Sequence, residues 1–191
     1  HATYVFYDEG TAGRMLSPED LPDLAGDVDA LLFGAISLIP EPCGSTYEAL
    51  MAREHAKRVT MLDPNIRPGF IPDRARHAER IARMMAMADI VKVSDEDLAW
   101  FGEAGSAEDV IRGWLQRGPK LIVLTQGGKG AVGYTRNHAV AVTPRQVEVV
   151  DTVGAGDTFN AGILASLHEQ GRLTKAALSD LPRDAIEKAL G

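Results

Sequence analysis

Short continuous runs of apolar residues alternate along the chain with segments in which apolar residues recur every three or four positions. A continuous apolar run predicts a buried strand, because a strand covered on both faces loses the alternation of a half-exposed one. Such runs lie at residues 30–36, 59–62, 89–93 and 121–124. Helical spacing, with charges on the opposite face, lies at residues 78–85 and 107–115. This succession of strands and helices predicts a parallel α/β arrangement.

The pattern changes toward the end of the chain. Apolar and small or polar residues alternate on either side of Arg136 and Asn137, which predicts a hairpin. The apolar run at 147–150 predicts one more strand, and residues 159–167 carry apolar side chains on both faces, which predicts a helix buried on most sides. The opening run, residues 1–7, is also strand-like and does not begin with methionine, so we expect that sequence is missing before it.

The composition narrows the class of partner. A formal net charge of -7, a sequence pI of about 5.2 and the lack of any run of Lys or Arg argue against a nucleic acid or an anionic membrane surface. The expected partner is therefore a small molecule. The longest apolar runs are too short for a membrane span, and the single cysteine, Cys43, fits a cytoplasmic location.

The segment DTVGAGDTFNAG carries the most specific chemistry. Gly154, Ala155 and Gly156 have little or no side chain, so their amides can converge on an anion, helped by the dipole of a helix that begins there. A phosphate repels the next residue, Asp157, unless that carboxylate has a proton to take. Asp157 is therefore expected to deprotonate a hydroxyl group that attacks phosphorus. The alternative is that Asp157 only caps the helix, although Asp151 supplies a second carboxylate that a cap does not need.

This segment resembles the second signature of the PfkB carbohydrate kinases, the ribokinase-like family of sugar and nucleoside kinases. The resemblance implies that Asp157 is the catalytic base and that the amides of residues 154–156 bind the γ-phosphate of ATP, with Asn160 on the nucleotide side. It also implies a monovalent cation, often K⁺, held by Asp151 and the carbonyl group of Val153.

Two further segments resemble the family in the expected order. VLTQGGKGA is by itself a hairpin turn, but it is similar to the family's T-x-G-x-x-G segment, which implies nucleotide contacts from Thr125, Gly127 and Gly130. VKVSDEDL is by itself a capping box between Ser94 and Asp97.

The same VKVSDEDL segment resembles the family's N-x-x-E motif, which implies that Asp97 acts on Mg²⁺ through water and that Ser94 lies near the nucleotide. Both motif residues differ here, because serine replaces asparagine and aspartate replaces glutamate. Aspartate is one methylene shorter, so Asp95 or Glu96 could share this role. Lys92 is either a phosphate contact or a solvated lysine at a strand end.

MLDPNIRPGF places polar residues where a buried strand opens into a loop, the usual edge for ligand sites in parallel sheets. One reading is an Asx-Pro turn with a surface arginine. The segment also resembles the D-x-N-x-R run of fructokinases and 2-keto-3-deoxygluconate kinases, which implies substrate or phosphate contacts from Asn65 and Arg67. A separate segment, residues 4–16, bears on the choice of substrate. In 2-keto-3-deoxygluconate kinases the corresponding segment commonly carries Tyr-Tyr-Arg, where this chain has Phe6, Tyr7 and Asp8. An acid there disfavours a carboxylated substrate and favours a neutral sugar such as fructose.

Together these features predict a three-layer α/β/α ribokinase-like fold with a mostly parallel sheet. Residues 1–191 are expected to form one partial kinase domain that lacks the N-terminal part and the lid. The expected function is ATP-dependent phosphorylation of a sugar, with fructose first and 2-keto-3-deoxygluconate, another sugar or a nucleoside second. A nucleotide-binding module without catalysis is the alternative from another class. The resemblance implies ATP, Mg²⁺ and K⁺ as cofactors, and it allows a homodimer, since lid-mediated dimers are common in the family.

Overall fold

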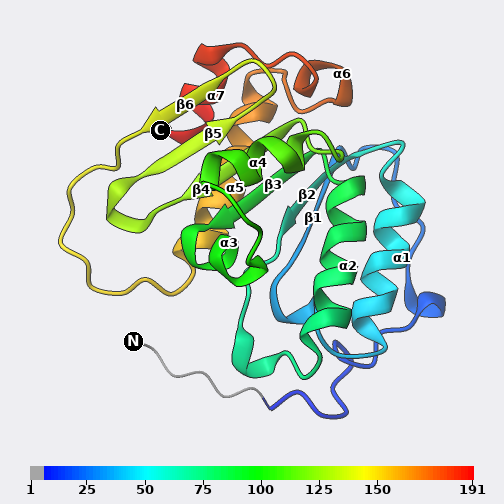
Figure 1. Cartoon of the computed structure of the whole chain (residues 1–191). Helices are drawn as coiled ribbons and strands as arrows, with labels where there is room; N and C mark the ends of the chain where they lie inside the picture. The colour runs from blue at the N-terminus through cyan, green and yellow to red at the C-terminus, as the bar shows by residue number, and fades with distance from the viewer. Residues whose placement is uncertain (1–6) are drawn as a thin grey trace.

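A six-stranded sheet forms the centre of the molecule, which is described over residues 7–191 by a computed structural model (Figure 1). The strands lie in chain order, β1 to β6. Their bounds are β1 Ala30–Gly34, β2 Val59–Asp63, β3 Ile90–Ser94, β4 Leu121–Thr125, β5 Ala131–Tyr134 and β6 Ala139–Val142. Strands β1 to β4 are parallel, whereas β4, β5 and β6 pair in antiparallel fashion. The predicted parallel strands and the hairpin are confirmed, but β1 is not the buried strand that its apolar run predicted. It is an edge strand in which only Phe33 is buried, and Leu32 is 45% exposed.

Helices connect the strands and follow the hairpin. The α-helices are α1 Cys43–Glu54, α2 Arg74–Met87, α3 Asp95–Phe101, α4 Ala107–Leu115, α5 Ala155–Glu169, α6 Lys175–Leu178 and α7 Arg183–Leu190. Short 3-10 turns are η1 Pro18–Asp20, η2 Ala35–Leu38, η3 Pro68–Phe70 and η4 Gly127–Lys129. Helix α4 spans the same residues as its apolar pattern, and Ser106 begins it with a capping box.

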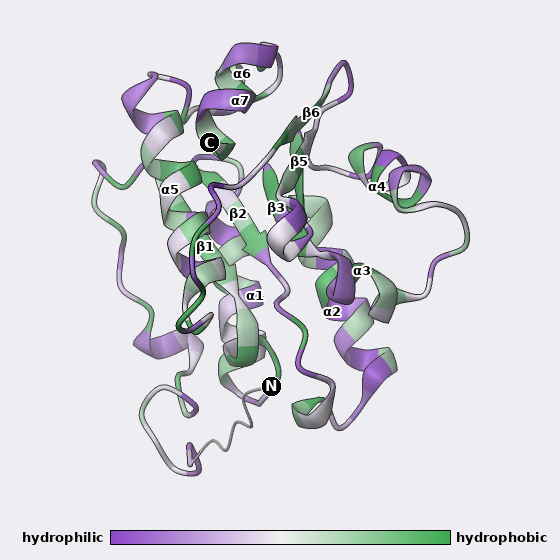
Figure 2. Ribbon diagram, turned by 90° about the vertical axis from the view of Figure 1, so that its left-hand side faces the viewer, coloured by the Kyte–Doolittle hydropathy of each residue, from purple (hydrophilic) through white to green (hydrophobic). Residues whose placement is uncertain are grey.

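Two hydrophobic cores cover the two faces of the sheet. One core joins the strands to α1–α4, with Met51, Ile81 and Trp114 among its buried side chains. The other joins the opposite face to α5–α7 through residues such as Ile163 and Ile186. Figure 2 shows the hydrophobic strands between α5 and α7 on one side and α3 and α4 on the other. The three-layer α/β/α fold is therefore confirmed.

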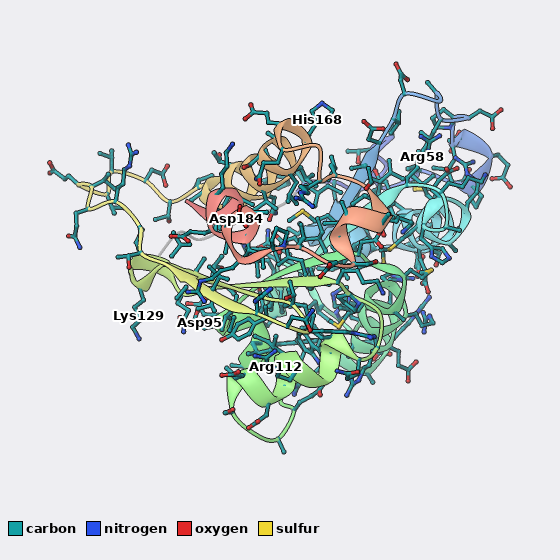
Figure 3. All side chains as sticks on the ribbon, turned by 90° about the horizontal axis from the view of Figure 1, so that it is seen from above. Arg58, Asp95, Arg112, Lys129, His168 and Asp184 are labelled. Carbon is teal, nitrogen blue, oxygen red and sulfur yellow. The ribbon has the colours of Figure 1, made fainter. Side chains whose placement is uncertain are left out.

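The view from above shows the same layers (Figure 3). His168 on α5 and Asp184 on α7 lie on one side of the sheet, and Arg112 on α4 lies on the other. Within residues 7–191, none of the helices has the length and apolar character that a membrane span requires.

Three further features differ from the sequence-based expectations. Residues 147–150 do not form a strand, because the segment has no neighbouring strand in the described chain and Val150 is 95% exposed. The long exposed connection that contains them runs from β6 to α5 (Figure 1). Helix α5 is buried on one face only, through residues such as Ile163 and Leu167, while Ala161 and Ala165 are exposed. The expected strand at residues 1–7 falls almost wholly outside the described residues, and Tyr7 itself is exposed coil.

Candidate active site

Polar residues gather at the edge of the sheet where the parallel strands end. Asp63, Ser94 and Thr125 are the last residues of β2, β3 and β4. The register aligns Ser94 with Thr125, and it aligns Gly34, at the end of β1, with Asp63. A Cβ atom on Gly34 would lie 2.3 Å from the carbonyl oxygen of Asp63, so only glycine allows β1 to pack this closely. The shared direction of the strands thus brings these side chains to one edge.

Helix α5 begins at the same edge. Its N-cap is Gly154, in the left-handed conformation with φ 77°, which glycine adopts without strain. The amide of Ala155, one of the three amides expected to bind phosphate, donates instead to the carbonyl oxygen of Thr152 at 3.2 Å. The amides of Gly156 and Asp157 have no acceptor within residues 7–191. The first turn of a 15-residue helix therefore presents free N–H groups and its positive dipole end.

Asp157 lies in that first turn. No amide in the described chain donates to the Asp157 carboxylate, so Asp157 does not cap the helix through a hydrogen bond. The Asp157 carboxylate is exposed and has no hydrogen-bond or ion-pair partner in the described chain. A carboxylate with no internal partner is free to accept a proton from a bound molecule.

Two cavities meet at this turn. The larger has a volume of about 770 Å³ and is lined by Gly156 together with the ends of β3 and β4. The smaller has a volume of about 270 Å³ and is lined by Asp157, Asn160 and the end of β1. Asn65 lines both cavities. Neighbouring residues of one helix turn therefore face two adjoining spaces.

A buried polar group separates these spaces. Lys92 Nζ lies 3.2 Å from Asp63 Oδ2, and Asn160 Nδ2 donates to the same oxygen at 2.7 Å. All three residues are buried, with Lys92 only 6% exposed. The alternative of a solvated Lys92 is thus wrong. Burial raises the pKa of the Asp63 carboxyl, whereas the Lys92 ammonium and the Asn160 amide act in the opposite direction.

The comparisons with known proteins identify the family. The model of the pfkB family carbohydrate kinases matches residues 3–178. The chain belongs to this family. It is 60% identical to a fructokinase of Rhizobium leguminosarum bv. trifolii over 97% of its own length and 57% of the relative's length. It is 35% identical to a fructokinase of Klebsiella pneumoniae over 88% of its own length and 55% of that protein's length.

Solved pfkB structures share the fold. The fructokinase of Vibrio cholerae O395 with fructose, ADP and calcium bound has a TM-score of 0.77 at 28% identity, covering 92% of this chain and 56% of that one. The aminoimidazole riboside kinase of Salmonella enterica, complexed with aminoimidazole riboside and an ATP analog, also has a TM-score of 0.77 at 28% identity, over 93% and 58% of the two chains. The chain spans a little over half the length of these relatives.

Most residues singled out by the pfkB resemblance line the two cavities. The larger cavity contains Asn65, Arg67, Lys92, Ser94, Asp97, Thr125, Gly127, Gly130, Ala155 and Gly156. The smaller contains Asn65, Asp157 and Asn160. Gly154, Asp151 and Val153 line neither cavity. The roles assigned to these residues stay predictions.

The pfkB acidic motif is built around a buried aspartate. Asp97 Oδ1 accepts from the amide of Ile66 at 2.8 Å, and Oδ2 accepts from the amide of Ser94 at 3.1 Å. The hydroxyl of Ser94 in turn accepts from the amide of Asp97, which completes the expected capping box. Asp97 therefore ties the loop after β2 to the start of α3, and it reaches the cavity with both oxygens already engaged.

Magnesium would fit this wall of the larger cavity. Asp95 and Glu96 are exposed, line the cavity and carry carboxylates beside Asp97. Figure 3 shows Asp95 at the same end of the molecule as Lys129 of the β4–β5 turn. No group of three or more His, Cys, Asp or Glu side chains is placed to share an ion within residues 7–191. Mg²⁺ is commonly held by one or two carboxylates together with water and substrate phosphates, so this donor set suits it.

The loop after β2 carries a residue in an uncommon conformation. Asn65 has φ 43°, a left-handed conformation that asparagine tolerates better than most residues. Arg67 donates to the carbonyl oxygen of Ile66 at 3.0 Å and lines the larger cavity. The segment is more than a surface turn, because both residues face the cavity that also receives the start of α5.

The β4–β5 turn supports both interpretations made from the sequence. Gly130 has φ 101°, and a Cβ atom there would lie 2.1 Å from the carbonyl oxygen of Val142. The hairpin therefore requires glycine for structural reasons. Thr125 and Gly127 nonetheless face the larger cavity, as a nucleotide-lining segment would.

The expected cation ligands lie on the exposed side of the α5 start. Asp151 Oδ1 accepts from the amide of Val153 at 3.0 Å, and both residues are exposed. Their role in binding a monovalent cation stays a prediction.

Asp8, which the sequence suggested as a determinant of substrate choice, forms an ion pair with Arg14 at 2.9 Å and lines a different cavity. The argument from Asp8 for a neutral sugar therefore has no support from its position.

Asp63 is a site residue for which the sequence analysis predicted no role. It is the first residue of the D-x-N-x-R segment. The available signal was a lone carboxylate at the end of an otherwise apolar strand. Such a residue must find a partner when buried, but its partners lie 29 and 97 positions away in the chain.

Proposed function

We propose that the protein transfers the γ-phosphoryl group of ATP to a hydroxyl group of a sugar, with fructose as the first candidate. The observation that carries this proposal is the junction of two cavities at the first turn of α5. Gly156 lines the larger cavity and Asp157 lines the smaller one. A phosphoryl group on one side and a hydroxyl group on the other would meet at this junction, which is the arrangement that direct transfer requires.

The larger cavity suits the nucleotide. Its volume of about 770 Å³ is within the range of cofactor pockets. The free amides of Gly156 and Asp157 are hydrogen-bond donors for phosphate oxygens, and the Lys92 ammonium adds a positive charge beside them. Arg67 supplies a second permanent positive charge. These groups would stabilise the charge that builds up on the transferring phosphoryl group.

The smaller cavity suits the acceptor. As the sugar oxygen forms its bond to the γ-phosphorus atom, the bond to the bridging oxygen of ADP breaks and the hydroxyl proton passes to the Asp157 carboxylate. Asp157 can accept this proton because no side chain or amide of the described chain occupies it. General base catalysis of this kind contributes roughly 10²–10⁴-fold to the rate.

Fructose is favoured by the similarity to known proteins. The relative at 60% identity is a fructokinase, and a structure at TM-score 0.77 is a fructokinase with fructose and ADP bound. An equally similar structure is a riboside kinase, so a nucleoside remains the second candidate. 2-Keto-3-deoxygluconate is a further candidate, because the position of Asp8 does not argue against it.

Bound magnesium would neutralise phosphate charge during transfer. The carboxylates of Asp95, Glu96 and, through water, Asp97 are the residues of this chain placed to hold it. K⁺ at Asp151 and Val153, a homodimer and a cytoplasmic location stay predictions.

A coupled assay of ADP release tests the proposal. The full chain is incubated with Mg-ATP and with fructose, 2-keto-3-deoxygluconate, ribose or adenosine, with and without K⁺. We expect the highest kcat/KM with fructose and a higher rate with K⁺. Binding of ATP without ADP release above background for any acceptor would contradict the proposal and favour a nucleotide-binding module without catalysis.

A further inference from the structure

Asp63 connects the two sides of the candidate site. Its Oδ2 atom accepts from Asn160 on α5 and lies within ion-pair distance of Lys92 on β3. Its main chain pairs closely with Gly34 on the neighbouring strand β1. The carboxylate of this β2 residue thus joins α5 to β3 at the point where the two cavities meet.

The buried Lys92 side chain has this carboxylate as its partner of opposite charge. An ammonium group removed from water is costly unless a partner of opposite charge lies beside it. Asp63 is the carboxylate within ion-pair distance of Lys92 in the described chain. A Cβ atom on Gly156 would lie 3.3 Å from Lys92 Nζ, so the ammonium is held directly beneath the first turn of α5.

Asn160 links the same carboxylate to the helix. It lies three residues after Asp157, one turn along α5, and residues at this spacing share a helix face. Asp63 Oδ1 and Asn160 Oδ1 have no hydrogen-bond partner within residues 7–191. The group therefore contains two buried oxygen atoms that can still accept a hydrogen bond close to the Lys92 ammonium.

We infer that Asp63 is a positioning residue for phosphoryl transfer, which holds the Lys92 ammonium against the start of α5 from the wall of the smaller cavity. The inference rests on the proposed function for its catalytic consequence. The predicted effect of Asp63 on ATP binding does not require catalysis, because it needs only that ATP binds in the larger cavity. Loss of the Asp63 charge should therefore act through Lys92.

Three variants test this inference in the full chain. Asp63→Asn keeps an oxygen that can accept from Asn160 but removes the charge. Lys92→Met removes the ammonium while keeping the length of the side chain. The double variant removes both charges together, which a buried ion pair commonly tolerates. The matched control is Asp89→Asn, because Asp89 is also buried and pairs with a lysine, Lys175, at 2.6 Å, but it lines neither cavity.

The first measurement is ATP affinity by calorimetry in the absence of sugar. We expect each single variant to weaken binding by about tenfold, and the double variant to bind no more weakly than Lys92→Met, since coupled residues are not additive. Asp89→Asn should lower the Tm and leave ATP affinity within about twofold of the wild type. The second measurement is turnover with the best acceptor, where the same pattern is expected.

Each outcome separates this inference from the proposed function. A folded Asp63→Asn variant that binds ATP as tightly as the wild type would overturn the inference, as would effects that multiply in the double variant. If Asp63→Asn does not fold, the comparison of Lys92→Met with the double variant decides, because a much weaker double variant contradicts action through Lys92. If the wild type phosphorylates no acceptor, the proposed function fails while the ATP measurements still test the role of Asp63.

Discussion

The Cβ position of Gly156 lies 3.3 Å from the Nζ atom of Lys92, so the first turn of α5 and the end of β3 are in direct contact through a glycine and an ammonium group. A side chain at residue 156 must displace that ammonium by a few tenths of an ångström. It would also cover the free amide beside it. We therefore expect nucleotide affinity to be sensitive to a single methyl group at residue 156.

Gly156→Ala is therefore expected to weaken ATP binding several-fold, as measured by calorimetry, without loss of the fold. The matched control is Gly162→Ala in the same helix, where a Cβ atom meets nothing within 4 Å. That substitution should leave ATP affinity unchanged and stabilise the protein by about 0.5–1 kcal/mol, since alanine favours a helix more than glycine does. Equal ATP affinity in the two variants would contradict the proposed anion site.

Asp157→Asn tests the base. The substitution keeps the size of the side chain but removes its ability to take a proton, so kcat is expected to fall by about 10²–10⁴-fold while ATP affinity changes little. The control is Asp184→Asn, because Asp184 is likewise an acid in the first turn of a helix, α7, but it lines neither cavity. That variant should keep the wild-type kcat. A near-normal rate in Asp157→Asn would rule out Asp157 as the base.

The fold could be predicted where short-range pattern determines structure. Strands β2, β3 and β4 lie within one residue of their apolar runs, since each is buried from end to end or nearly so. Helix α1 was missed because several of its buried positions are small or polar, such as Cys43, Gly44 and Thr46. The run at 147–150 was assigned to a strand because its composition suits one, but a strand also requires a neighbour to pair with.

The candidate site likewise contains a part that the sequence predicts and a part that depends on long-range packing. Gly156 and Asp157 are adjacent in the chain, so their common position at a helix start followed from the sequence alone. The group formed by Asp63, Lys92 and Asn160 depends on how β2, β3 and α5 pack, and no local pattern encodes that. The buried state of Lys92 was one of two open alternatives for this reason, and only the long-range packing decides it.

The β4–β5 turn gives a stability prediction. Gly130→Ala would place a methyl group 2.1 Å from the carbonyl oxygen of Val142 at a residue with φ 101°, so the hairpin must distort. We expect a loss of at least about 2 kcal/mol in the free energy of unfolding, measured by urea denaturation. The control is Gly128→Ala, two residues earlier, where a Cβ atom meets nothing within 4 Å. It should change stability by no more than about 0.5 kcal/mol.

His77 gives a prediction for the dependence of stability on pH. The side chain is buried on α2, its ring packs edge-on against Trp100, and its Nδ1 atom has no hydrogen-bond partner within the described residues. Burial lowers the pKa of His77, and the nearby Arg80 charge lowers it further. His77 therefore binds a proton near pH 6.5 in the unfolded chain, whereas in the folded protein it is protonated only at lower pH.

Because the unfolded state binds more protons in this window, the free energy of unfolding should fall as pH drops below about 6.5, until the lowered pKa of the folded state is reached. The contribution of His77 to this slope is at most about 1.4 kcal/mol per pH unit. His77→Phe keeps the ring against Trp100 and should flatten the slope between pH 6.5 and the lowered pKa, as measured by urea denaturation at a series of pH values. His168→Gln removes an exposed histidine instead and should leave the slope closer to that of the wild type. A wild-type slope in His77→Phe would show that other groups govern the acid sensitivity of the fold.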